Sequence, residues 1–165
     1  MKKLLAAGVV AALMLFGSAS AAHAGDTSHA HIKKVVVTHA VVTPTLVTGS
    51  GLGMVRTFSA PITVNGTAKA GSYFAGTLTT IMIDPTTNQD VRSSNLNFVF
   101  GSSTNQLIIG GVAVYPADGS TLAVGATTTR PIIGGSGRYA GAKGWAVSTN
   151  LGSTGWKHVF HIQMS

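Results

Sequence analysis

The chain has 165 residues, of which 45% are hydrophobic and only 9% are charged, and it contains no cysteine. Disulfides and cysteine-linked lipid anchors are therefore excluded within this sequence. The formal charge of +7 is spread along the chain with no clustered basic face, so we expect solubility and weak attraction to anionic surfaces rather than nucleic-acid binding.

The N-terminal segment has the organisation of a secretory signal peptide. Lys2 and Lys3 form a positive start, Leu4 to Phe16 form an apolar stretch, and Ala22 and Ala24 form a small-x-small cleavage site. The apolar stretch is shorter than the roughly 20 residues that a bilayer-spanning helix needs. A secreted product, periplasmic or extracellular, that does not span the membrane is expected.

The signal peptide sets the expected division of the chain. Residues 1–24 are expected to be removed, and residues 25–32, which have no apolar pattern, to form a flexible tail. Residues 33–165 are then expected to form a single domain, which is long enough to bury a core without cross-links.

The remainder of the sequence predicts one short strand after another. Each candidate is rich in β-branched or aromatic residues and is bounded by turn-forming residues, and none has a sustained 3.6-residue apolar repeat. The predicted strands are Lys33 to Val42, Met54 to Ser59, Ile62 to Ala68, Tyr73 to Asp84, Val91 to Phe100, Gln106 to Tyr115, Thr121 to Ile133, Arg138 to Thr149 and Trp156 to Met164. This pattern is typical of an all-β sandwich or barrel.

The most distinctive segment is Pro131 to Val147, with the sequence PIIGGSGRYAGAKGWAV, in which five glycines interrupt strand-like sequence. Glycines inside strands mark bulges, bends or a close approach of another backbone. We therefore expect this part of the sheet to be strongly curved.

The run GGSGRYAGAKG, together with GSTL at Gly119 to Leu122 and the closing strand WKHVFHI, resembles the glycine-rich hallmark of the dirigent and allene oxide cyclase barrel families. The likeness spans about Ser72 to Ile162. It implies an all-β fold, a closed eight-stranded antiparallel β-barrel of the calycin-like, allene oxide cyclase/dirigent type. It also implies a homotrimer by analogy, and no cofactor is expected.

The resemblance is incomplete at the positions that carry chemistry in those families. Lignan-forming dirigents typically have an acidic residue where this chain has Arg138, and plant cyclases have a glutamate where it has Ala140. Tyr139 keeps the aromatic residue that both families favour, and Lys143 alone matches a basic residue of the dirigents. The resemblance therefore implies the fold without a complete active site.

Alternation with a period of two predicts which side chains point into the barrel. In the last strand this set includes Trp156, His158 and Phe160. The predicted ligand-pocket residues are Phe74, Leu78, Met82, Arg138, Trp145, Trp156, His158 and Phe160. The interior of an eight-stranded barrel can be filled by side chains or can hold one small ligand, and the sequence leaves both outcomes open.

Few residues can carry acid–base chemistry. Asp84 precedes Pro85, a pair that commonly opens a turn. If its carboxylate tilted into the barrel mouth near Lys143 or Arg138, it would be a plausible general acid or base. The predicted catalytic set is accordingly Asp84, Tyr139 and Lys143.

The histidines near the start of the mature chain invite a metal-site interpretation. His29, His31 and His39 are potential ligands, but no further ligand stands at a recognisable spacing. No metal site is expected. His158, on the apolar face of the last strand, is expected to be a hydrogen-bonded core or rim residue.

Two classes of function remain. The first is a secreted small β-barrel protein that binds a small hydrophobic molecule or serves as a scaffold, without a complete active site. The alternative, which rests on the resemblance, is a dirigent-like or allene oxide cyclase-like isomerase or auxiliary protein that steers cyclisation or radical coupling in the barrel. Paired ionisable groups converging inside the barrel would favour the alternative.

Overall fold

The computed structural model describes residues 31–117 and 119–164, and it is built almost entirely from β-strands. The strands are β1 (Ile32–His39), β2 (Thr45–Thr48), β3 (Val55–Val64), β4 (Thr67–Ile83), β5 (Asp90–Val99), β6 (Gln106–Tyr115), β7 (Thr127–Ser136), β8 (Lys143–Asn150) and β9 (Trp156–Gln163). Two single 3₁₀ turns, η1 (Gly137–Tyr139) and η2 (Gly152–Thr154), precede β8 and β9. The predicted signal peptide and most of the predicted tail lie outside the described residues.

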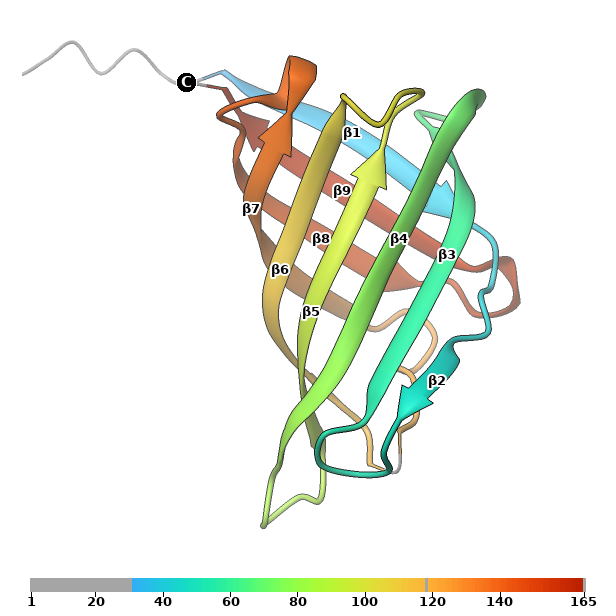
Figure 1. Cartoon of the computed structure of the whole chain (residues 1–165), viewed down its shortest axis with the longest axis vertical. Helices are drawn as coiled ribbons and strands as arrows, with labels where there is room; N and C mark the ends of the chain where they lie inside the picture. The colour runs from blue at the N-terminus through green and yellow to red at the C-terminus, as the bar shows by residue number, and fades with distance from the viewer. Residues whose placement is uncertain (1–30, 118, 165) are drawn as a thin grey trace, which may run out of the picture.

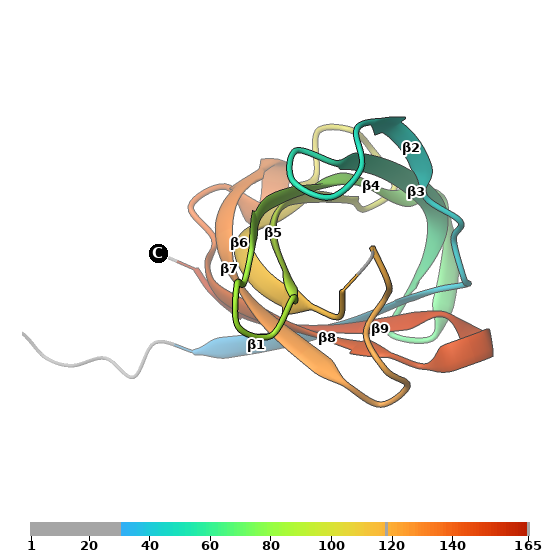
Figure 2. The same cartoon turned by 90° about the horizontal axis from the view of Figure 1, so that it is seen from below.

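The strands form one antiparallel sheet in the order β1-β9-β8-β7-β6-β5-β4-β3-β2 (Figure 1). Pairing of β1 with β3, at Val37 with Val64 and Thr38 with Thr63, closes eight of the strands into a barrel. The view along the barrel shows this closure, with β2 lying outside as an extra strand on the edge of β3 (Figure 2). The predicted fold, a closed eight-stranded antiparallel barrel, is confirmed.

The strand β3 joins the predicted strand Met54 to Ser59 to the first part of the predicted strand Ile62 to Ala68, whose remaining residues form the turn at residues 65 and 66 and the start of β4. Pro61 lies where the neighbour of β3 changes from β2 to β1 and where its register with β4 shifts. A proline is tolerated at such a position because no interrupted ladder needs its missing N–H. The strand is therefore continuous through Pro61, from Val55 to Val64.

The segment before β7 differs from the prediction. A strand was expected from Thr121, but β7 begins at Thr127. Residues 119–124 instead form a loop at one end of the barrel, where they line its interior (Figure 2). We call residues 119–124 the mouth loop.

The two ends of the barrel differ in how they are filled. The main core cluster occupies the end at which β1 begins and β9 finishes, and it consists mainly of large aliphatic and aromatic side chains. Its fully buried members are Val37, Phe98, Leu107, Ile109, Ala146, Phe160 and Ile162. We call this the closed end, and the opposite end, which carries the mouth loop, the open end.

The glycine-rich segment shapes the closed end. Gly144 in β8 has φ of 120°, and a Cβ atom there would overlap the carbonyl oxygen of His161 on β9. Only glycine allows these two backbones to approach so closely. Tyr139, held by η1, packs against Phe100 with ring centroids 4.8 Å apart and covers this end of the core.

Candidate ligand-binding site

A cavity of about 860 Å³ occupies the open end of the barrel. Its deepest lining residues, Phe74, Leu96 and His158, are buried, and they separate it from the core of the closed end. One half of the barrel interior is therefore packed by side chains, and the other half holds a space of small-molecule size.

One wall of this cavity is apolar. Phe58 and Phe74 form part of it, with ring centroids 5.6 Å apart, and Leu78 and Trp156 continue it toward the mouth. These side chains come from β3, β4 and β9, whose inward positions alternate with outward polar ones. The wall can contact the hydrophobic body of a bound molecule.

The mouth loop partly covers the cavity. Leu122 is buried against Ala113 and Tyr115, and its carbonyl oxygen accepts a hydrogen bond of 2.6 Å from the Asn150 side-chain amide. The Asn150 oxygen in turn accepts a hydrogen bond of 2.9 Å from the backbone N–H of Gly152. The loop is thus held in place by β8 and η2.

Three arginines, from β3, β5 and β7, also line the cavity, and Arg56 pairs directly with Leu78 across β3 and β4. Arg92 is almost fully buried, donates a hydrogen bond of 2.7 Å to Asp90 and lies 4.3 Å from the ring centroid of Tyr115. Arg56 also lines the cavity, and its Nη1 is buried with no hydrogen-bond partner among residues 31–117 and 119–164. Burial, with a smaller contribution from Arg92, lowers the pKa of Arg56.

Arg130 is the most unusual of the three, because all its side-chain partners are neutral. It is 2% exposed, and it donates to Ser94 Oγ at 2.8 Å, to Tyr115 OH at 2.7 Å and to Thr128 Oγ1. Buried cations are usually compensated by carboxylates. Here hydroxyl dipoles from β5, β6 and β7 do so.

A hydrogen-bonded chain of three side chains, Ser148, His158 and His39, also lines the cavity. Ser148 Oγ lies 2.8 Å from His158 Nδ1, His158 Nε2 lies 3.1 Å from His39 Nε2, and His39 Nδ1 lies 2.7 Å from the carbonyl oxygen of Ala40. That carbonyl can only accept, so neutral His39 carries its proton on Nδ1 and accepts at Nε2. His158 then donates from Nε2, and the Ser148 hydroxyl donates to His158 Nδ1. Each tautomer is fixed by its neighbour.

Burial keeps both imidazoles neutral. Loss of hydration lowers the pKa of His39, and it lowers the pKa of His158 further, with added repulsion from His39 and Arg130. The ring of His39 also stacks on Phe74 with centroids 4.0 Å apart. The histidine pair therefore adds polarity to the cavity without adding charge.

The histidine pair should make the protein less stable as the pH is lowered. Below about pH 6.5 an unfolded histidine binds a proton that the folded one does not, at up to about 1.4 kcal/mol per pH unit for each group. We expect the free energy of unfolding to be retained above pH 6.5 and to drop by about 1–2 kcal/mol between pH 7.5 and 5.5. Urea titrations at both pH values measure this change.

The matched variants are His158→Gln and His161→Gln. His158→Gln should flatten the pH dependence, whereas His161→Gln should preserve it, because His161 stacks on Trp145 on the outer face of the sheet. An equal slope in all three proteins would contradict the assignment.

Several residues predicted for the pocket line the cavity. Phe74, Leu78, Trp156 and His158 all do so. Phe160 belongs to the core of the closed end, where it packs against Phe98 with centroids 4.9 Å apart. It supports the floor of the cavity from below.

Two pocket predictions are wrong. Met82 is 48% exposed, because the register of β4 with β5 shifts between Thr80 and Met82 and turns the following side chains outward. Trp145 is 39% exposed, because it pairs with His161 across β8 and β9, and directly opposed residues point to the same face. Small residues such as Ala146 take the inward positions of β8 instead.

The predicted catalytic residues do not converge. Tyr139, Lys143 and the pocket candidate Arg138 lie at the closed end, and the Arg138 guanidinium stacks on the Tyr139 ring at 4.9 Å. Asp84 caps the β4–β5 turn, which projects beyond the open end (Figure 1): its Oδ1 accepts from the N–H groups of Thr86 and Thr87 at 2.8 and 3.0 Å. These bonds lower the pKa of Asp84 and hold it as a turn residue.

Apart from His158, the polar residues that line the cavity are not among the predicted site residues. Asp90 and Arg92 stand at even-numbered positions of β5, on the same face as Leu96 and Phe98. This alternation was the available signal. Arg130 shares a face with Ile132 in the same way, but its neutral partners come from other strands and carry no local signature.

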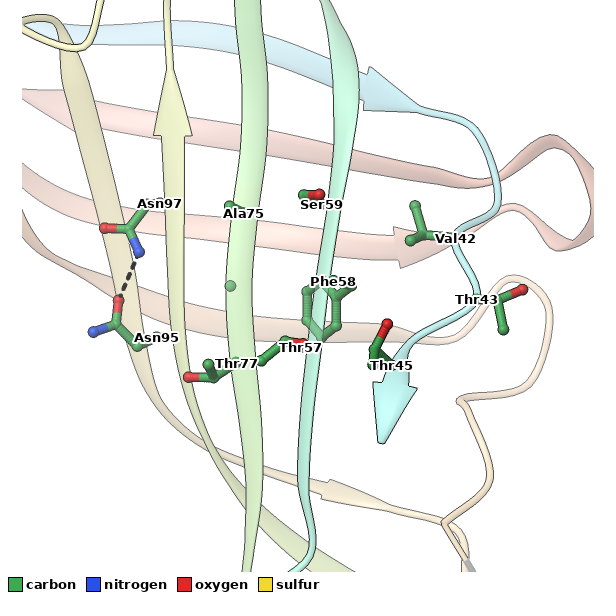
Figure 3. Close-up of a pocket in the computed structure, with 11 residues that line it drawn as sticks. Val42, Thr43, Thr45, Thr57, Phe58, Ser59, Ala75, Thr77, Asn95 and Asn97 are labelled. Carbon is green, nitrogen blue, oxygen red and sulfur yellow. Dashed lines mark hydrogen bonds between the residues drawn. The ribbon is translucent and has the colours of Figure 1, made fainter. Parts of the chain in front are cut away.

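A second, shallower hollow of about 570 Å³ lies against the outer face of the barrel, between the β1–β2 segment and strands β3 to β5 (Figure 3). It is lined mainly by small polar side chains, and Asn97 Nδ2 donates a hydrogen bond of 3.1 Å to Asn95 Oδ1 within it. None of its described lining residues is ionisable. The candidate site is therefore the interior cavity.

Two further structural properties concern membranes and metals. Within the described part of the chain, no helix is long and apolar enough to cross a bilayer. Over the same residues, no three His, Cys, Asp or Glu side chains lie close enough together to hold a metal ion. His39, one of the histidines considered as a ligand, is instead paired with His158.

No family model and no curated protein matches the sequence. Solved structures do match the fold. A pyocyanin demethylase aligns with a TM-score of 0.58 and 18% identity over 81% of this chain and 100% of that chain. The pterocarpan synthase dirigent protein GePTS1 aligns with a TM-score of 0.56 and 14% identity over 92% of this chain and 100% of that chain. The Diels Alderase AbmU from Streptomyces koyangensis has the same TM-score and identity over 84% of this chain and 71% of that chain. This chain thus shares its barrel fold with these proteins, a dirigent protein among them, in line with the resemblance of the glycine-rich segment.

Proposed function

We propose that the protein binds a small, largely hydrophobic molecule in the open half of the barrel. The observation that carries this proposal is the cavity of about 860 Å³, whose lining includes Phe58, Phe74, Leu78 and Trp156. Ligand pockets typically measure about 300–1,000 Å³ and combine such a wall with a few polar groups. A barrel filled at one end and hollow at the other provides both a rigid frame and a binding space.

A cavity-filling substitution tests this function. Leu78→Trp should weaken binding of the neutral fluorescent probe N-phenyl-1-naphthylamine at least tenfold, because the indole would occupy the space beside Trp156. Ile81→Trp is the matched control, since Ile81 is 48% exposed on the same strand. Fluorescence titration measures both. If both variants bind the probe like the wild type, the cavity is not the binding site.

A second function is favoured by the ionisable groups that converge inside the barrel. Asp90 and Arg92 form a buried pair, Arg92 and Arg130 both lie near the ring of Tyr115, and His158 also lines the cavity. In this form of the proposal, the cavity restricts the conformation of a bound substrate while the polar wall steers its cyclisation or coupling. The likeness to proteins named as a Diels Alderase and a dirigent protein supports this reading.

Export and assembly belong to the proposal as well. We infer secretion from the N-terminal segment, residues 1–24, with its positive start and apolar stretch. A homotrimer is the assembly that the resemblance to dirigent and cyclase barrels implies. The mass of the mature protein under native conditions, compared with its denatured mass, reports both properties.

A further inference from the structure

The charge of the cavity is unbalanced. Three guanidinium groups line the cavity, on Arg56 of β3, Arg92 of β5 and Arg130 of β7. Within the described residues, 31–117 and 119–164, the cavity lining includes no acidic side chain, and Asp90 behind it is the partner of Arg92. The whole sequence contains only four acidic residues. These described groups give the cavity wall a surplus of positive charge.

The bonding of Arg130 leaves donors available. A guanidinium has five N–H groups, and three are used in its bonds to Ser94, Tyr115 and Thr128. The Tyr115 oxygen accepts from Arg130, so its own hydrogen remains free to donate. Both side chains line the cavity. Together they offer N–H and O–H donors from a site where water is largely displaced.

The neighbouring groups do not compete for an anion or repel one. The histidine pair is neutral, and every ring nitrogen of His39 and His158 is already used in the hydrogen-bonded chain that ends at Ser148. The apolar wall, with Phe58 and Phe74, faces the same space. The cavity therefore combines a hydrophobic surface with a site for one negative group.

We propose that the bound molecule is an amphipathic oxyanion, with an apolar body against Phe58, Phe74 and Leu78 and one carboxylate, sulfonate or similar group held by Arg130 and Tyr115. Arg56 adds a second positive charge near the mouth. A guanidinium recognises such oxygens with charge-assisted, directional hydrogen bonds. The bound anion also supplies a counter-charge to the buried Arg130, whose side-chain partners among residues 31–117 and 119–164 are all neutral. This inference rests on the proposed binding function, and it assigns the chemical class of the ligand.

Two probes that share one aromatic scaffold test this inference. Anilinonaphthalene sulfonate carries a negative group, and N-phenyl-1-naphthylamine is its neutral counterpart. The wild type should bind the anionic probe more tightly. Arg130→Met should weaken binding of the anionic probe at least tenfold, Tyr115→Phe should weaken it about threefold, and both should leave the affinity for the neutral probe within twofold. Leu78→Trp, which fills the cavity, should weaken both probes.

The control for net charge is Lys34→Met, which removes an exposed positive charge from the outer face of β1. It should leave both affinities within twofold. Thermal unfolding monitored by circular dichroism reports whether each variant is folded. If Arg130→Met does not fold, Tyr115→Phe and Arg56→Met decide, since neither removes the bonds of Arg130 to Ser94 and Thr128.

The outcomes separate the two proposals. Binding of the neutral probe as tightly as the anionic one, or equal weakening of both probes in the Arg130 and Tyr115 variants, overturns the anion site and leaves the binding function standing. Failure of the wild type to bind either probe overturns the binding function itself.

Discussion

Truncating Phe98 to alanine is expected to lower the free energy of unfolding by about 3–5 kcal/mol, the usual loss for a fully buried phenylalanine. Phe98 has no exposed surface. It stacks on Phe74 at 5.7 Å and meets the rings of His158 and Phe160 edge-on, each at 4.9 Å. The side chain packs against Phe74 and His158, which line the cavity, and against Phe160 of the closed end, so its removal takes contacts from both groups. Urea unfolding monitored by circular dichroism measures the loss.

Tyr73→Ala provides the comparison on the neighbouring strand. Tyr73 pairs with Val99, one position from the pairing of Phe74 with Phe98, but its ring is 42% exposed on the outer face. Its truncation should cost less than about 1 kcal/mol. Similar losses in the two variants would show that Phe98 does not hold the interior together as described.

Gly144→Ala is expected to cost about 3 kcal/mol or more. Its φ of 120° is unfavourable for any L-residue with a side chain. The added methyl group would also overlap the carbonyl oxygen of His161, so β8 and β9 would have to separate. Strain and lost pairing add together at this one position. The midpoint of thermal unfolding should fall sharply, as measured by calorimetry.

A control variant, Gly66→Ala, separates the cost of backbone strain from the cost of steric overlap with a neighbouring strand. Gly66, in the turn between β3 and β4, has φ of 81°, but a Cβ atom there would meet nothing within 4 Å. Gly66→Ala should therefore cost only about 1–2 kcal/mol, the penalty for a left-handed conformation. If Gly66→Ala were as damaging as Gly144→Ala, the close approach of β8 and β9 would not be the reason for glycine in β8.

The fold was predictable because its signals are local. Short β-branched segments bounded by turn residues predict strands, and the glycine-rich segment around Gly144 identifies the curved end of a barrel. Strand boundaries were predicted wrongly where the local rule that proline ends a strand did not apply, because the neighbouring strand changes at that position. Pro61 separates two predicted strands, yet β3 continues through it because its neighbour changes there.

Inward and outward faces were predictable only as far as the register is regular. In β9 the alternation predicts His158 and Phe160 inside, where both are buried. The same rule fails at Met82, because a single register shift reverses the faces beyond Thr80. The outward direction of Trp145 follows from its pairing with His161 on β9. His161 points to the face opposite to that of His158, so Trp145 points outward as well.

The candidate site depends on contacts between distant strands, which a single sequence does not record. Arg130 would ordinarily be assigned to solvent, and it is buried because Ser94 and Tyr115 bring hydroxyl groups to it from β5 and β6. The resemblance directed attention to Tyr139 and Lys143, which lie at the closed end. The converging ionisable groups that would favour a reaction-steering role are instead at the opposite end of the barrel.

The division of the barrel interior into a packed closed end and a cavity at the open end also has an evolutionary consequence. Most residues of the packed core and most residues that line the cavity lie in different halves of the barrel, so substitutions in the two sets should combine with little epistasis, except at Phe74 and Leu96, which belong to both. A lineage could then exchange Arg130, Tyr115 or the mouth loop step by step and acquire new specificities without passing through an unfolded intermediate. The same separation makes the open end a suitable region for laboratory diversification, with the glycine-rich closed end held constant.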